Sequence, residues 1–161
     1  MAVEAPISKY KKTNFKIFFG ICIAIAVIFA YDGYLSKYEW SGRYSFYKEQ
    51  VLDNDGKPTP TMKFNRKSPP FFLAGAVLFA VSLYLLKDKR LIADENELVI
   101  SEKKRISYDS IQQIDKTYFE KKGFFVITYK DKRGGEVRLR LSDRKYDNLP
   151  AVLEHLVAKI T

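Results

Sequence analysis

Two long runs of apolar residues dominate the hydrophobic pattern of this sequence. The first carries no charge from Ile17 to Tyr31, and a helix over 15–35 provides about the 20 residues that a ~30 Å hydrocarbon layer requires. The second run, 71–86, follows two prolines, which suit the first turn of a helix but disrupt its interior. Both runs are apolar on every side, unlike a helix that lies on a soluble core. The pattern therefore predicts two transmembrane helices.

A buried helix of a soluble protein is the alternative interpretation of each run, and it is the usual one for apolar runs of 10–14 residues. The chain that remains after the second run is too short to cover two fully apolar helices. Small residues recur four positions apart at Gly20 and Ala24 and again at Ala76 and Ala80. This spacing lets membrane helices approach closely, so we expect the two helices to pack through these positions.

After the second run the pattern changes to short strands separated by turn residues. In the last strand Val137, Leu139 and Leu141 alternate with Arg138 and Arg140, so one face is expected to be buried and the other exposed. The pattern predicts an antiparallel meander. Its expected strands cover 90–93, 97–100, 105–108, 113–119, 124–129 and 136–141.

An amphipathic helix is expected to close the chain. Asp147 or Asn148 can cap it, and Pro150 lies in its first turn. One apolar stripe on this helix predicts that it covers one sheet, so that residues 90–161 would fold alone as a soluble domain. The stripe consists of Leu149, Val152, Leu153, Leu156, Val157 and Ile160.

This order of strands and helix resembles the pleckstrin-homology-like (PH-like) fold, specifically the bacterial PH-like domains of small membrane proteins. The resemblance rests on the strand 98–100, the run of Ile, Tyr and Ile positions over 106–114 and the hairpin over 121–125. It covers roughly residues 90–160. It implies an α+β membrane protein with a two-helix transmembrane hairpin and a small antiparallel PH-like barrel or sheet capped by the C-terminal helix. A full member has seven strands, so one is missing or comes from the exit of the second helix.

The net charge of +9 is concentrated beside the apolar runs, as it is at the flanks of membrane spans. A nucleic-acid-binding domain would instead carry its own basic face, so we expect no nucleic-acid partner. The flanks predict a basic cytoplasmic tail over 1–14, a non-cytoplasmic loop over 36–70 and a cytoplasmic domain over 90–161, in a bacterial inner membrane. The flanking residues are Lys9, Lys11, Lys12 and Lys16 before the first run and Lys87, Lys89 and Arg90 after the second.

Aromatic residues in the first half of the loop are candidates for protein contacts. Trp40, Tyr44, Phe46 and Tyr47 belong to the residue types that are enriched at the cores of interfaces. Packing against lipid headgroups is an equally good explanation of these residues.

Basic residues in two predicted turns are candidates for weak contact with anionic lipid. Members of the PH-like family that bind phosphoinositides generally use a basic loop between the first two strands, but the loop here, 94–97, is acidic and would repel a phosphate. An ordinary solvated turn is the alternative for both clusters. The clusters are Lys103, Lys104 and Arg105, and Lys130, Lys132 and Arg133.

No pattern in the sequence indicates catalysis. His155 is the only histidine and has no partner at metal-ligand spacing, so it is expected to be a surface residue, and Cys22 is the only cysteine. Phosphate-binding glycine motifs and hydrolase motifs do not occur. We therefore expect no enzyme activity, cofactor, metal or small-molecule substrate.

The sequence as a whole predicts a non-enzymatic accessory or scaffold subunit of a membrane protein complex. Its expected partners are the lipid bilayer and other integral membrane proteins, because helices with wide apolar faces suit partner helices as well as lipid. The alternative is a membrane-tethered sensor of anionic lipid headgroups.

Overall fold

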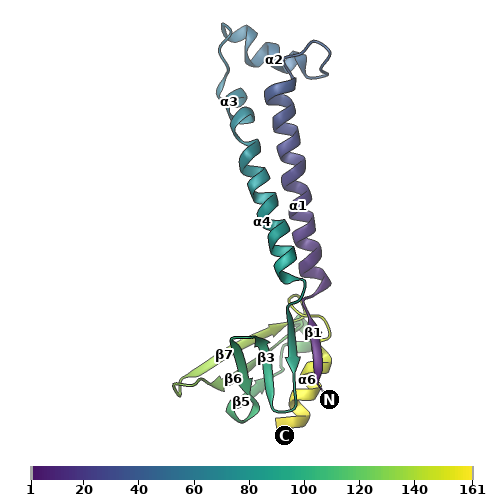
Figure 1. Cartoon of the computed structure of the whole chain (residues 1–161), viewed down its shortest axis with the longest axis vertical. Helices are drawn as coiled ribbons and strands as arrows, with labels where there is room; N and C mark the ends of the chain where they lie inside the picture. The colour runs from purple at the N-terminus through teal and green to yellow at the C-terminus, as the bar shows by residue number, and fades with distance from the viewer. Residues whose placement is uncertain (1, 161) are drawn as a thin grey trace. The chain divides into compact units, whose positions relative to one another are not determined.

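The computed structural model describes residues 2–160 and is an α+β structure (Figure 1). The chain forms two compact units. One comprises the residues up to Thr13 together with those from Leu85 onward, and we call it the sheet unit. The other comprises Asn14–Tyr84 and is called the helical unit.

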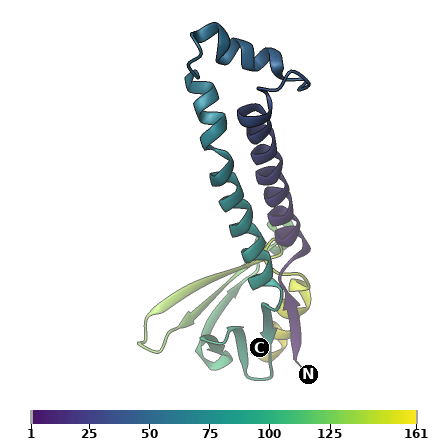
Figure 2. The ribbon, with the colours of Figure 1, turned by 45° about the horizontal axis from the view of Figure 1, so that its top comes forward.

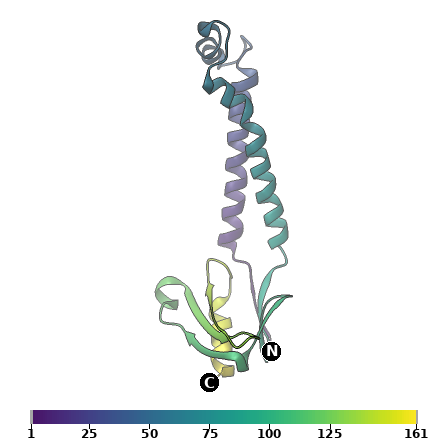
Figure 3. The ribbon, with the colours of Figure 1, turned by 90° about the vertical axis from the view of Figure 1, so that its left-hand side faces the viewer.

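Two long helices make up most of the helical unit. Helix α1 (Lys9–Ala30) continues into a π-helical turn, Tyr31–Leu35, and α4 (Pro69–Leu86) runs back beside it (Figures 1 and 3). Helix α1 begins earlier than the predicted residue 15, because Ser8 Oγ accepts a hydrogen bond from the Lys11 backbone N–H (3.2 Å) and lysine is a good helix former.

The predicted loop 36–70 is largely helical. It contains α2 (Tyr44–Gln50), a 3₁₀ turn over Leu52–Asn54, and α3 (Pro60–Lys67). Thr59 caps α3 by accepting a hydrogen bond from the Met62 backbone N–H (3.3 Å), and Pro60 occupies the first helical position. This segment is therefore folded rather than a simple connection.

Small residues line the contact between α1 and α4. Ala26 and Ala76 are almost fully buried, and a Cβ added at Gly75 would lie 3.5 Å from Cys22 Sγ. The predicted spacing was right only for Ala76, because the other three small residues are exposed. The contact stripe of α1 runs through Cys22 and Ala26, about half a turn away from Gly20 and Ala24.

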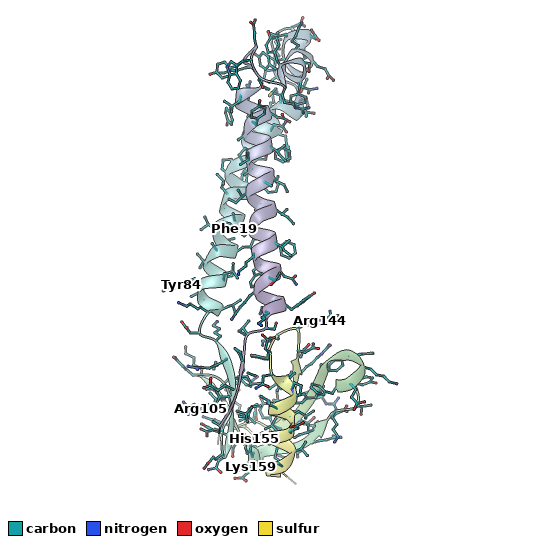
Figure 4. The ribbon with its side chains drawn as sticks, turned by 90° about the vertical axis from the view of Figure 1, so that its right-hand side faces the viewer. Phe19, Tyr84, Arg105, Arg144, His155 and Lys159 are labelled. Carbon is teal, nitrogen blue, oxygen red and sulfur yellow. The ribbon has the colours of Figure 1, made fainter. Side chains whose placement is uncertain are left out.

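Both helical segments are long and apolar enough to cross a membrane: Lys9–Leu35 and Pro60–Leu86. Only 6% and 11% of the residues in their most apolar windows are buried. The core helix of a soluble domain would be mostly buried. Tyr84, for example, is 76% exposed and points away from α4 (Figure 4).

The sheet unit contains two antiparallel sheets and a C-terminal helix. The first has the order β1-β2-β3-β4 and the second β5-β6-β7. These elements confirm the predicted α+β class, the antiparallel sheets and the C-terminal helix. The strands are β1 (Val3–Pro6), β2 (Arg90–Ala93), β3 (Glu97–Ser101), β4 (Lys104–Ser107), β5 (Ile111–Asp115), β6 (Phe124–Lys130) and β7 (Glu136–Ser142), and the helix is α6 (Leu149–Ile160).

The strand predicted over 113–119 was too long and began too late, since β5 starts at Ile111. This strand ends at Asp115, and a short helix, α5 (Phe119–Lys122), follows before β6; a 3₁₀ turn over Tyr108–Ser110 precedes β5. Gly123 ends α5 with a positive φ of 65°, and a Cβ there would lie 1.9 Å from the Asp143 carboxylate. A larger residue here would be strained at this φ and would displace the Asp143 side chain, so the position favours glycine.

The segment predicted as an N-terminal tail contributes a strand to the sheet unit. Strand β1 pairs antiparallel with β2, so that Val3 lies opposite Ala93 and Pro6 opposite Arg90. Ala5 is fully buried in the core. Residues 90–161 are therefore only part of this unit, because β1 comes from the residues before α1.

Side chains near the start of α6 also bind the N-terminal segment. The Asp147 carboxylate accepts a hydrogen bond from the Lys9 backbone N–H (3.0 Å), and Asn148 Nδ2 donates to the Glu4 carbonyl (3.0 Å). Ser8 Oγ donates to the Arg144 carbonyl (2.6 Å). The two residues predicted as helix caps thus hold β1 and the start of α1.

The core of the sheet unit lies between the two sheets and α6 (Figures 2 and 3). Phe125 is its largest fully buried side chain. The predicted stripe of α6 faces this core: four of its residues are buried and Val157 and Ile160 are partly buried against them. The four are Leu149, Val152, Leu153 and Leu156.

Candidate interaction surfaces

The residues 31–68, which we call the cap, hold the predicted aromatic residues. Trp40 is 70% exposed, and its ring stacks on Tyr38 with centroids 5.6 Å apart. Tyr44 and Tyr47 stack along α2 (6.3 Å) and are partly buried, as is Phe46, whose ring lies 4.8 Å from the Arg43 guanidinium carbon. Trp40 is therefore the most accessible of the four.

A bidentate ion pair holds the start of the cap. Arg43 donates from Nε and Nη2 to the two carboxylate oxygens of the buried Asp32 at 2.8 and 3.0 Å. The hydrogen bond and the charge of Asp32 raise the pKa of Arg43 above its usual value. Ser36 Oγ donates to the Asp32 carbonyl, and Ser41 Oγ donates to the Tyr31 hydroxyl (3.1 Å).

A close backbone contact holds the end of the cap against its first residues, in the π-helical turn that follows α1. Arg66 Nε donates to the Gly33 carbonyl (2.9 Å), and the Tyr34 hydroxyl donates to the Arg66 carbonyl (2.7 Å). A Cβ at Gly33 would lie 2.9 Å from the Asn65 carbonyl oxygen, so the contact requires glycine. The residues around Trp40 are thus carried by a segment that is fixed at both ends.

One of the two predicted basic clusters stays together on a single hairpin. Lys130, Lys132 and Arg133 lie on the β6–β7 hairpin and are exposed. Asp131 Oδ1 closes this turn by accepting hydrogen bonds from the Arg133 and Gly135 backbone N–H groups at 2.9 and 2.8 Å. The turn is thus closed within its own segment, and its three basic side chains are exposed.

The other predicted cluster, over 103–105, is divided between two environments. Lys104 points to the second sheet, where its Nζ lies 6.0 Å from the Tyr129 ring centroid. Lys103 and Arg105 instead line a groove of about 830 Å³, which we call the basic groove. Figure 4 shows Arg105 on the side of the first sheet away from α6. Its other basic lining residues are Lys11, Lys89, Arg90 and Lys145, and its acidic ones are Asp88 and Glu102.

The sequence did not reveal the basic groove because its lining comes from four separate segments of the chain. Lys11, Lys89 and Arg90 were noticed, but only as flanks that set the orientation of the spans. Lys145 carried no signal at all. These residues meet because β1 is paired with β2 and the 142–147 loop binds the start of α1.

The acidic turn after β2 is closed by hydrogen bonds. The Tyr108 hydroxyl (2.7 Å) and His155 Nε2 (2.9 Å) both contact the Asp94 carbonyl oxygen. Burial, followed by the charges of Asp94 and Glu97, raises the pKa of Tyr108 to about 12. His155, predicted as a surface residue, is half-buried on α6 and joins this network (Figure 4).

A second hollow, of about 650 Å³, lies beside α5. It mixes both signs of charge, since Lys121, Lys122 and Arg144 line it together with Glu120 and Asp143. Among residues 2–160 no group of three or more histidine, cysteine or carboxylate side chains is placed to hold a metal ion. The basic groove is therefore the more strongly polarised of the two hollows.

Comparison with protein-family models, with curated proteins and with solved structures finds no match to this chain. The cap, the basic groove and the pairing of the N-terminal strand are the features of this chain that bear on its function.

Proposed function

We propose that this chain is a non-enzymatic integral membrane protein that acts as an accessory or scaffold subunit of a membrane protein complex. The observation that carries the proposal is the exposure of Trp40 on a cap fixed by the Asp32–Arg43 pair and the Gly33–Arg66 contact. Preorganised, exposed aromatic side chains are typical of interface centres, because little conformational entropy is lost when they bind.

We also propose that both helices cross the membrane and that both termini lie on the same side of it. The pairing of β1 with β2 supports the common side, because the residues before the first span and those after the second build one sheet. The basic residues near Lys9 and Lys89 favour the cytoplasmic side. The cap then lies on the opposite side, available to partners there.

We also retain the PH-like fold and a bacterial inner membrane as proposals. Two antiparallel sheets of four and three strands, followed by a C-terminal helix, support the fold assignment. This strand count matches the seven strands expected of a full member once β1 is included.

Photo-crosslinking from the cap tests the scaffold role. Benzoylphenylalanine in place of Trp40 is expected to give a discrete heavier band in native membranes, which protease removes and mass spectrometry resolves into a partner protein. Leu52, which is 46% exposed in the same cap, is the matched control position and should give little of this band.

Two results would contradict the scaffold role. One is a set of lipid adducts alone at Trp40, which would assign the aromatic residues to headgroup packing. The other is crosslinking of equal strength at Trp40 and Leu52, which would show contact without a defined surface.

A second candidate function is contact with anionic lipid, and the charge of the basic groove favours it. It is compatible with the scaffold role, because the cap and the basic groove belong to different units.

A further inference from the structure

We propose that the basic groove binds the headgroup of an anionic phospholipid. This inference uses the membrane anchorage proposed above and is independent of the scaffold role. The occupant is a lipid of the surrounding membrane that carries a phosphodiester and net negative charge.

The charges that line the groove favour an anion. Six basic and two acidic residues give it a formal charge of +4. Two of the basic residues are engaged: Arg90 pairs with Glu4 and Arg105 with Glu97, both at 2.9 Å. Among the described residues no ion pair is found for the lysines of the groove at positions 89, 103 and 145. All three ammonium groups are exposed and can contact a phosphate, and Lys145 Nζ also lies 5.1 Å from the Tyr146 ring centroid.

The floor of the groove is apolar, as a lipid requires. Ile92 and Val99 lie opposite each other in the β2–β3 register and alternate with Leu91 and Leu98, which face the core. They therefore lie on the outer face of the sheet, where polar residues are usual. Ile100, in the irregular β3–β4 pairing between Val99 and Ser101, also lines the groove while packing partly against the core.

The position of the groove in the chain places it near the membrane surface. Lys89 follows the last residue of α4, Leu86, by three positions, and Lys11 lies in the first turn of α1. Three extended residues span at most about 11 Å, and a headgroup layer is roughly 5–8 Å deep. If the two helices cross the membrane, the groove is within reach of the headgroups.

The arrangement suits a single phosphodiester better than a polyphosphorylated headgroup. Tight binding of several phosphates uses the planar guanidinium fork of arginine, and both arginines of the groove are held by carboxylates. Lysine acts as a point charge and gives attraction with little selectivity. The acidic turn that starts at Asp94 lies at the opposite end of β2 and β3.

Native mass spectrometry of the full chain in mild detergent tests the proposal, with phosphatidylglycerol and phosphatidylcholine as probes. The variant K89Q/K103Q/K145Q removes three positive charges from the groove. The variant K130Q/K132Q/R133Q removes three from the β6–β7 hairpin and is the matched control. Since each basic residue near an anionic surface contributes about a fivefold factor in affinity, the loss of three should weaken phosphatidylglycerol binding by the groove variant roughly a hundredfold.

The wild type should prefer phosphatidylglycerol over phosphatidylcholine, and the hairpin variant should stay within about threefold of the wild type. Equal losses in the two triple variants would mean general attraction by total charge and would overturn the proposal. So would undiminished binding by the groove variant, or equal binding of the two lipids. If the triple variant has a lowered thermal midpoint, the single variant K103Q replaces it in the comparison. K103Q should bind phosphatidylglycerol about fivefold more weakly than the wild type.

Discussion

A fragment that begins at Leu85 and lacks the N-terminal segment will not unfold cooperatively. The N-terminal segment supplies β1 and the buried side chains of Ala5 and Ile7 to the core. A buried isoleucine contributes about 1.5–3 kcal/mol, and each strand hydrogen bond about 0.5–1.5 kcal/mol. Their sum is comparable to the total stability of a small domain, about 5–15 kcal/mol.

The matched control joins the two parts of the sheet unit directly. The Ile7 backbone N–H donates to the Lys89 carbonyl (3.2 Å), so the ends of β1 and β2 are adjacent. Replacement of residues 14–84 by a short Gly/Ser linker should therefore give a soluble protein with a single sharp urea transition. The same transition midpoint for the linked protein and the fragment from Leu85 would contradict the role of β1.

Leu156→Ala will destabilise the linked sheet unit by about 2–5 kcal/mol, the usual range for truncation of a buried leucine. Leu156 is fully buried on the face of α6 that covers the core. Glu154, two positions earlier on the same helix, is exposed, and Glu154→Ala should change stability by less than about 0.5 kcal/mol.

Urea denaturation followed by circular dichroism measures both variants of α6. The free energy of unfolding should fall for Leu156→Ala with an unchanged slope against urea, since the surface exposed on unfolding stays the same. Indistinguishable midpoints for the two variants would show that α6 does not bury this face.

The pattern of the sequence predicted the later strands and α6 well because one face of each is buried. The alternation over Glu136–Ser142 and the helical stripe over Leu149–Ile160 indicate directly which side of each element packs against the core. Strand β1 has four residues and ends in a proline, too short for its period to be recognised. It is a strand because β2 offers a free edge and Asn148 binds the Glu4 carbonyl.

The rotation of the two long helices about their axes was not predictable for a different reason. Helices that are apolar on every side carry no stripe, so Gly20 and Ala24 were as plausible a contact as Cys22 and Ala26. In the cap, the Thr59–Pro60 pair was a recognisable helix start. The Asp32–Arg43 pair joins residues eleven positions apart across an irregular turn, and no periodic pattern marks such a contact.

The most direct test of the two-span arrangement is to determine on which side of the membrane each segment lies. In a Cys22→Ala background, three single-cysteine variants would be treated with an impermeant maleimide in whole cells whose outer membrane, where present, has been opened. Ser45→Cys is in the cap, Ala2→Cys precedes β1 and Ser101→Cys ends β3; all three positions are exposed. We predict labelling of Ser45→Cys in intact cells, and labelling of Ala2→Cys and Ser101→Cys only after the inner membrane is permeabilised. Labelling of Ala2→Cys and Ser101→Cys from opposite sides would contradict the two-span arrangement.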